Sequence, residues 1–295
     1  MGYLFLAFAL MAGLTKGYCG KRLGGFAANT QSAVMLNMIR MLLCIGFAFA
    51  VLLLNGDLAS VSLSPTLILI SALSGVGSSF FVVSWLMAVR KNAYMMIDVF
   101  LMLGTLVPML LGYALFSEPI TLRQWIGFAL LIVATLVMCS YNKAIKTKLT
   151  LPALLLLLAC GAASGITDFS QKLFVKTFPQ LPITVFNLYT YVFAALTLAI
   201  VFAIVARKEK PKFENSASRS RFLYVFIMAA ALTANSQFKT MAAVHLDSAK
   251  LYPLTQGIAL GLSTLMATVC FKEKFTRKAG LGITLAFAAL LIMNL

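Results

Sequence analysis

The sequence is short of acidic residues, histidine and closely spaced cysteines. Asp and Glu together number 8, there is one histidine (His245), and no two of the five cysteines lie near each other. This set excludes a zinc site and a disulfide framework, and it argues against an enzyme, which would need a nucleophile, an acid–base pair or metal ligands. The phosphate-binding pattern G-x-x-x-x-G-K-[ST] is also missing, so we expect no ATP site, no catalytic residue, no metal and no cofactor.

Apolar residues, in contrast, dominate the chain. It is 61% hydrophobic and 11% charged, with a mean hydropathy of +0.96, whereas soluble domains are about 45–50% apolar and about 25% charged. The apolar runs are long enough for spanning helices of roughly 20 residues, and too continuous for a β-barrel. They lie near residues 2–20, 31–54, 66–89, 93–115, 124–141, 150–174, 182–205, 221–244, 248–270 and 278–295.

Two parts of the chain repeat each other. Residues 116–138 align without a gap with residues 271–293, sharing Phe, Glu, Thr, Gly and Met at matching positions, and Asn37 earlier in the chain matches Asn187. Each copy holds five apolar runs. Because five is odd, the second copy must enter the membrane from the opposite side, which is the inverted repeat typical of secondary transporters.

We therefore predict an all-α integral membrane protein with ten transmembrane helices arranged as two inverted five-helix repeats. The predicted domains are residues 1–141 and 150–295, joined by a linker at 142–149. Because one chain holds both repeats, a monomer suffices, and a homodimer is the alternative.

The repeated pattern consists of a Glu in a short loop (Glu118 and Glu273), a Thr three residues later, and a last helix that carries a Gly. This pattern, closing a five-helix unit used twice, resembles the EamA-type members of the drug/metabolite transporter superfamily. The resemblance covers nearly the whole chain. It implies a carrier with a central cavity open to one side at a time, and a substrate among amino acids, sugars, nucleotide derivatives, phosphorylated metabolites and drugs.

The net charge of +16 is unevenly spread along the chain. Most Lys and Arg residues lie in the odd-numbered loops, while Arg123, Lys172 and Lys176 are the basic residues near the even ones. By the positive-inside rule we predict a multi-pass protein of the cell (plasma) membrane with odd loops in the cytoplasm and both termini outside. The resemblance implies the opposite orientation. Basic loops of this kind contact anionic lipid headgroups, and no nucleic-acid partner is expected.

Seven charged residues lie within the predicted spans. An ionised group at mid-bilayer costs about 2.5–3.5 kcal/mol on insertion scales, so such residues face the protein interior or a water-filled cavity. Counting from the helix ends separates them into two groups, one in each half of the membrane, and each group carries an excess of positive charge that favours an anionic or zwitterionic substrate. The first group is Lys16, Arg40 and Asp98; the second is Asp168, Lys172, Lys239 and Lys250.

Individual roles follow from depth and spacing. Arg40 is the deepest cation, and we expect it to hold an anionic group of the substrate together with Lys16 or Lys250. Asp98 has no opposite charge at i±3 or i±4, so it either carries a coupled proton or pairs with Lys16 or Arg40 across helices. The uncharged residues expected to orient the substrate are Asn37, Asn187, Gln237 and Gln256.

Most of these residues have a structural alternative. Asp168 and Lys172 are spaced i,i+4 with the acid first, so they can satisfy each other. Lys239 and Lys250 lie near helix ends, from which their ammonium groups can reach the interface. The Asn and Gln side chains can simply bond helix to helix. For Glu118 and Glu273, capping of a helix N-terminus is the favoured interpretation.

We interpret the chain as a secondary, gradient-driven transporter of a small anionic or zwitterionic metabolite that works by alternating access, with the substrate bound near the midplane. Asp98, Asp168, Lys172 and Lys239 are the candidates for proton coupling or gating, and exchange or uniport is equally open. The alternatives are a multidrug or organic-cation exporter of the same superfamily, and a flippase for a lipid phosphate.

Overall fold

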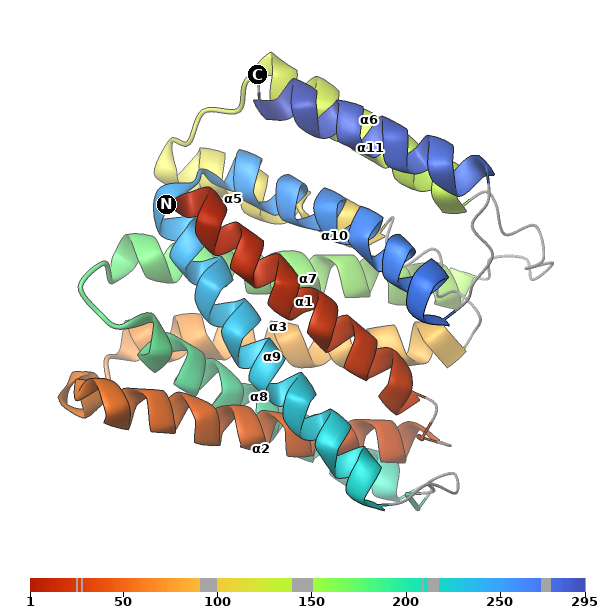
Figure 1. The fold of residues 1–295 in the computed structure, drawn as a ribbon. Helices are drawn as coiled ribbons and strands as arrows, with labels where there is room; N and C mark the ends of the chain where they lie inside the picture. Colours follow the sequence, from red (N-terminus) through yellow and green to blue (C-terminus); the bar gives the residue numbers. More distant parts are fainter. Residues whose placement is uncertain are drawn as a thin grey trace. The chain divides into compact units, whose positions relative to one another are not determined.

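The computed structural model describes the chain except for residues 25, 28, 91–99, 140–150, 208–209, 212–217, 272–276 and 295. The regular elements of the described residues are helices (Figure 1). In chain order these are α1 (Gly2–Gly24), α2 (Thr30–Asn55), the 3-10 helix η1 (Asp57–Ser60), α3 (Pro65–Arg90), α5 (Leu106–Phe116), α6 (Leu122–Cys139), α7 (Leu151–Thr177), α8 (Ile183–Ala206), α9 (Ser218–His245), α10 (Ser248–Phe271) and α11 (Arg277–Asn294).

Six helices of the described chain are long and apolar enough to cross a membrane: α1, α2, α3, α7, α8 and α10. Shorter apolar stretches lie at Phe100–Phe116, Leu122–Ala134 and Gly280–Met293. The predicted all-helical, multi-pass membrane protein is therefore confirmed. α9 has 28 residues, long enough to span, but it contains the polar stretch 233–240 and is not apolar enough to be counted with the six.

The apolar runs and the helices agree to within a few residues, with one exception. The run at 93–115 is helical at residues 100–104, turns at Thr105 and continues as α5; its residues 93–99 lie outside the described part of the chain. Pro108 explains the turn, because proline has no N–H to bond the carbonyl four residues earlier. Thr105 bonds the Met102 carbonyl through both its backbone N–H, at 3.1 Å, and its hydroxyl, at 2.7 Å.

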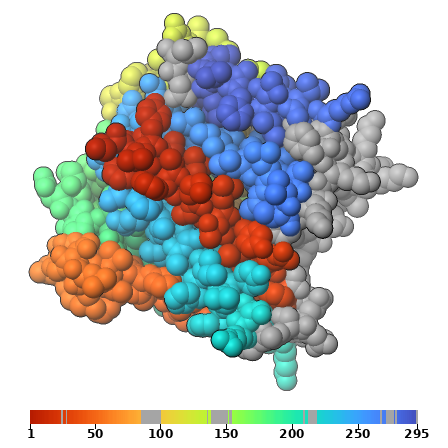
Figure 2. Space-filling model, viewed as in Figure 1, coloured from red at the N-terminus to blue at the C-terminus, as the bar shows by residue number. Residues whose placement is uncertain are grey.

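The chain divides into two compact units, each built from both halves of the sequence. Unit 1 comprises Met1–Val83 and Ser170–His245, and unit 2 comprises Ser84–Phe169 and Leu246–Leu295. In unit 1, α1 packs along α9, and α2 packs against α8 and α9 (Figure 1). The space-filling view shows the side chains of α1 and α9 in direct contact (Figure 2). α9 therefore has three neighbouring helices, α1, α2 and α8, against which its polar residues can pack.

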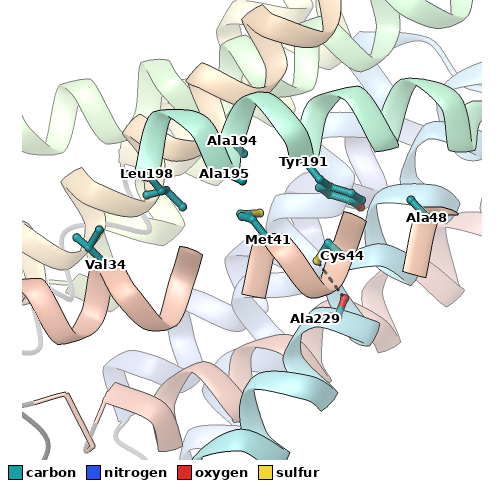
Figure 3. Close-up of a cluster of buried hydrophobic side chains, with 9 residues drawn as sticks. All are labelled: Val34, Met41, Cys44, Ala48, Tyr191, Ala194, Ala195, Leu198 and Ala229. Carbon is teal, nitrogen blue, oxygen red and sulfur yellow. Dashed lines mark hydrogen bonds between the residues drawn. The ribbon is translucent and has the colours of Figure 1, made fainter. Parts of the chain in front are cut away.

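The apolar core of unit 1 lies where α2, α8 and α9 meet (Figure 3). Small residues such as Ala48, Ala194 and Ala229 are fully buried there and let the helices approach closely. α3 also comes very near α8, because a Cβ added to Gly75 would lie 2.5 Å from the Thr190 carbonyl oxygen. Only glycine fits at this crossing.

In unit 2, α6 packs along α11, and α10 packs against α5, α6 and α11. Glycines again mark the closest approaches: a Cβ on Gly127 of α6 would lie 2.1 Å from Met293 of α11, and one on Gly161 of α7 would lie 2.2 Å from the Phe100 carbonyl oxygen.

Glu118 follows α5 and is buried. Its Oε2 accepts the backbone N–H of Ser248, the first residue of α10, at 2.8 Å. The predicted capping role is thus confirmed for Glu118, but the capped helix is α10 rather than the helix that follows Glu118 in sequence.

Candidate functional site

A hydrogen-bonded network joins α8 to α9 in unit 1. Asn187 is 1% exposed; its amide nitrogen donates to Gln237 Oε1 at 2.9 Å, and its Oδ1 accepts from the Ser236 hydroxyl at 2.8 Å. The Thr184 hydroxyl also donates to Gln237 Oε1, at 3.5 Å. Both amide oxygens are therefore occupied. Among the described residues, the Gln237 amide nitrogen has no hydrogen-bond acceptor, so the network presents a donor.

Arg40 of α2 is a deeply buried cation of unit 1. It is 5% exposed. One terminal nitrogen, Nη1, approaches the Met228 sulfur at 3.9 Å, and Nε is buried without a hydrogen-bond partner among the described residues. Its near neighbours include Cys44 and Tyr191. A thioether sulfur is a weak acceptor, so the guanidinium group is poorly satisfied inside the protein.

No carboxylate of the described part of unit 1 lies near enough to neutralise Arg40. The single acidic residue described there, Asp57, begins η1 beyond the end of α2, about five helical turns from Arg40. Burying an unpaired charge costs several kcal/mol. Among the described residues the guanidinium group of Arg40 therefore has no carboxylate partner, and Asp98, the partner that the sequence allowed, lies outside them.

Sequence spacing explains why these side chains converge. On α2, Arg40 and Cys44 are four residues apart, and on α8 Thr184, Asn187 and Tyr191 follow the i, i+3, i+7 spacing of one helix face. The Cys44 thiol donates to the Ala229 carbonyl of α9 at 3.5 Å (Figure 3). Thr233 of α9 also lies near Cys44. Tyr191 lies close to Cys44, Thr233 and Ser236. We call this set the polar seam: Arg40, Cys44, Thr184, Asn187, Tyr191, Thr233, Ser236 and Gln237.

The structure brings together two of the predicted site residues, Asn187 and Gln237. Arg40 lies on the same packed helices but beside Met228, nine residues before Gln237 on α9. Asn37 is half-buried and bonds the Ala33 carbonyl of its own helix at 2.8 Å. Lys16 on α1 and Lys239 on α9 are half-buried in the same unit. Lys172 is 2% exposed, and its ammonium group donates to the Ala243 carbonyl at 3.2 Å. Ala243 lies in the last turn of α9, where a cation is favoured by the helix dipole.

The other predicted residues belong to unit 2 or lie outside the described chain. Asp168, Lys250 and Gln256 are half-buried in unit 2. The backbone carbonyl of Asp168 accepts the Tyr252 hydroxyl at 2.7 Å, which joins α7 to α10. Asp98 and Glu273 lie outside the described residues. The predicted second charge group is thus distributed over both units, two lysines in unit 1 and the remaining two residues in unit 2.

The sequence reasoning missed Thr184, Thr233 and Ser236. Their signal was present in the sequence. Thr184 and Tyr191 share the helix face of Asn187, and Thr233 is one turn before Gln237. A search for polar residues on the same face as each candidate amide would have found them.

Comparison with known proteins agrees with this architecture. Residues 151–295 match the model of the EamA-like transporter family. Among 28 similar chains of solved structures, one titled "Crystal structure of protein" superposes with a TM-score of 0.78 at 15% identity, covering 99% of this chain and 95% of that one. This likeness concerns the fold alone. No curated protein matches the sequence.

Proposed function

We propose that this chain, whose residues 151–295 match the model of the EamA-like transporter family, is a member of that family and carries a small anionic or zwitterionic metabolite by alternating access. The observation that supports this most directly is the burial of Arg40 and the lack of a hydrogen-bond partner for its Nε among the described residues. Such a buried cation favours a negative charge beside it.

The finer architecture belongs to the same proposal: ten spans in two inverted repeats, residues 1–141 and 150–295. Contacts within each unit support it. α2 packs against α8, α5 against α10 and α6 against α11, and each of these pairs joins helices that the sequence repeat makes equivalent. Gly127 and Met293 meet at the α6–α11 contact. At each of these positions the two copies of the repeat carry the same residue type.

The proposed energy source is an ion or substrate gradient, since the sequence has no ATP-binding motif. A membrane potential supplies roughly 2.3 kcal/mol per charge per 100 mV. Asp98 is the proposed proton carrier, and exchange without protons is the alternative. The proposed location is the plasma membrane, with the basic odd loops in the cytoplasm.

A thermal-shift screen of the full-length protein in detergent tests the substrate class. The panel consists of small carboxylates, phosphates, amino acids, nucleotide sugars and quaternary amines, because a ligand that binds the folded state raises the melting temperature. We expect an anion or zwitterion to stabilise the wild-type chain and to lose this effect in Arg40→Gln. Arg207→Gln is the matched control, because it removes an exposed cation from the same unit.

The opposite result would contradict the proposal. Stabilisation by quaternary amines that persists in Arg40→Gln and disappears in Asp98→Asn would identify an organic-cation exporter. Stabilisation by a phosphorylated lipid added to the panel, with none by the small anions, would identify a flippase.

A further inference from the structure

The end of α1 lies beside the start of α9 in unit 1. The Asn235 side chain of α9 donates to the Ala9 carbonyl of α1 at 2.6 Å, whereas the ring of Phe26, just after α1, lies 6.1 Å from the Tyr224 ring between centroids. Later residues of α1 thus meet earlier residues of α9, and the two helices run antiparallel. The last turn of α1 and the first turn of α9 are therefore at the same end of the unit (Figure 1).

A hydrogen bond fastens two further helix ends at this place. The Asn29 side chain accepts the Ser32 N–H at 2.9 Å as the cap of α2, and its amide nitrogen donates to the backbone carbonyl of Lys210, which follows α8. Asn29 is 8% exposed, so this bond belongs to the packed structure. It holds the α8–α9 connection against the start of α2 and leaves the Lys210 side chain exposed.

The side chains around these four helix ends are strongly basic. Six cations of the described residues lie there, and no Asp or Glu is described at this end. The part of the α8–α9 connection outside the described residues holds two lysines and two glutamates, so it leaves the excess unchanged. At the opposite end of the unit, the exposed Lys176 is accompanied by the acidic Asp57. The six cations, which we call the basic end, are Lys21, Arg22, Arg207, Lys210, Arg219 and Arg221.

Exposed apolar side chains border the basic end on two helices. Ile204 of α8 is 57% exposed, and the exposed Arg207 follows it by three residues. Phe222 of α9 is 58% exposed, and the exposed Arg219 precedes it by three residues. Because residues three apart are neighbours on a helix surface, each helix places a cation one turn outside an apolar side chain.

This arrangement matches the two parts of a phospholipid. The acyl chains contact the exposed apolar side chains, and the headgroup phosphate, one turn further out, meets the cations. Lys and Arg near a membrane surface attract anionic headgroups, and the arginine fork suits phosphate oxygens. On α1, the guanidinium carbon of Arg22 lies 5.5 Å from the centre of the Tyr18 ring, and tyrosine is typical of the headgroup level of a bilayer.

We propose that the basic end of unit 1 is a binding surface for anionic phospholipids of the surrounding bilayer. It recognises the headgroup phosphate through cations from α1, α9 and the α8–α9 connection, and it prefers lipids that carry no compensating ammonium group. The surface is separate from the polar seam, so it binds lipid whichever metabolite the chain carries.

The test titrates lipids into the full-length protein in a neutral detergent and follows the melting temperature, which a bound ligand raises. The ligands are dioleoyl phosphatidylglycerol, dioleoyl phosphatidylcholine and the soluble glycerol 3-phosphate. The variant Arg22→Gln with Lys210→Gln removes two exposed cations of the basic end and keeps the Asn29 bond, which uses the Lys210 backbone. The variant Arg123→Gln with Lys176→Gln is the matched control, because it removes two exposed cations elsewhere and leaves the same net charge.

We expect wild type to bind phosphatidylglycerol about tenfold or more tightly than phosphatidylcholine. A cation near an anionic surface is worth about fivefold in affinity, so the basic-end variant should bind phosphatidylglycerol about tenfold or more weakly, and the control variant within about twofold of wild type. Glycerol 3-phosphate should give no shift that depends on Arg22 and Lys210.

Three outcomes overturn the proposal. Equal affinity for the two lipids means that the headgroup is not recognised. Equal weakening by the two double variants means that net charge, and not this surface, attracts the lipid. A glycerol 3-phosphate shift that is lost in the basic-end variant means that the site takes a soluble phosphate. If the basic-end variant does not fold, Arg219→Gln against Arg123→Gln gives the same comparison, and equal affinities of these two for phosphatidylglycerol reject the proposal.

Discussion

The amide nitrogen of Asn187 donates to Gln237 Oε1 at 2.9 Å, so α8 is fastened to α9 inside unit 1. The repeat equivalent of Asn187, Asn37 on α2, bonds the carbonyl of Ala33 in its own helix. The same residue type thus serves two roles in the two copies. One amide fixes a pair of helices, and the other is held by its own helix and remains half-buried.

This difference predicts unequal costs for two matched substitutions. Asn187→Ala removes the bond to Gln237 and leaves Ser236 without its acceptor. Asn37→Ala removes a bond within one helix. Hydrogen bonds between membrane helices average about 0.6 kcal/mol and reach about 1.7 kcal/mol. We expect Asn187→Ala to lower the free energy of unfolding by about 1–2 kcal/mol and Asn37→Ala to leave it nearly unchanged, as measured by thermal unfolding in one detergent. Equal losses would mean that the α8–α9 network adds no stability.

The helices were predictable because a bilayer imposes one simple rule on sequence: long apolar runs become helices. To predict the break at Thr105, the effect of Pro108 on the helix would have had to be considered. The polar seam was harder, because Arg40, Tyr191 and Ser236 are far apart in sequence and meet only through the packing of α2, α8 and α9. Spacing along one helix predicts which residues share a face. It does not predict which other helix that face will meet.

Lys172 shows how a charge inside a membrane helix can have a structural partner that sequence spacing does not reveal. The i,i+4 spacing favours Asp168 as a partner, and the structure gives the ammonium group a hydrogen bond to the Ala243 carbonyl in the last turn of α9. Lys172→Met keeps the length of the side chain but removes the donor and the charge at this helix end. We expect a loss of about 1–2 kcal/mol in unfolding free energy.

Lys176→Met, one turn further along α7, is the control for this substitution, because Lys176 is exposed. Its expected effect on thermal unfolding is within about 0.5 kcal/mol. A Lys172→Met protein as stable as the wild type would contradict the structural role and return Lys172 to the candidates for gating.

Gly75 and Gly46 provide a sharp comparison of two helical glycines in unit 1. A Cβ on Gly75 would lie 2.5 Å from the Thr190 carbonyl oxygen and 2.6 Å from Phe193 Cβ, whereas a Cβ on Gly46 would meet nothing within 4 Å. Gly75→Ala must force α3 away from α8, and overpacking of this kind costs about 1–3 kcal/mol. Gly46→Ala should be neutral or slightly stabilising, because alanine favours the helix. Melting temperatures measured side by side in one detergent check both, and equal values would show that the α3–α8 crossing tolerates a side chain.

Glu118 was singled out by the repeat pattern, and its partner on α10 is 130 residues away in sequence. Removing an N-terminal cap costs about 0.5–2 kcal/mol. We expect Glu118→Ala to lose stability in this range, while Glu118→Gln, which keeps an oxygen acceptor for the Ser248 N–H, should lose less. Thermal unfolding again provides the measurement. If Gln is as harmful as Ala, the carboxylate charge matters more than the hydrogen bond.

The orientation in the membrane can be tested with two exposed positions on opposite sides. Leu63, before α3, is 78% exposed, and Lys210, after α8, is also exposed. Each is replaced by cysteine in a background where Cys139 and Cys270 are alanine, since Cys19, Cys44 and Cys160 are buried. The basic residues cluster in the loop that contains Lys210, so the positive-inside rule predicts that this loop is cytoplasmic. A membrane-impermeant maleimide should therefore label Leu63→Cys in intact cells and Lys210→Cys only after permeabilisation. The reverse pattern would place both termini inside, as the family resemblance implies, and would show that the distribution of Lys and Arg does not set the topology of this chain.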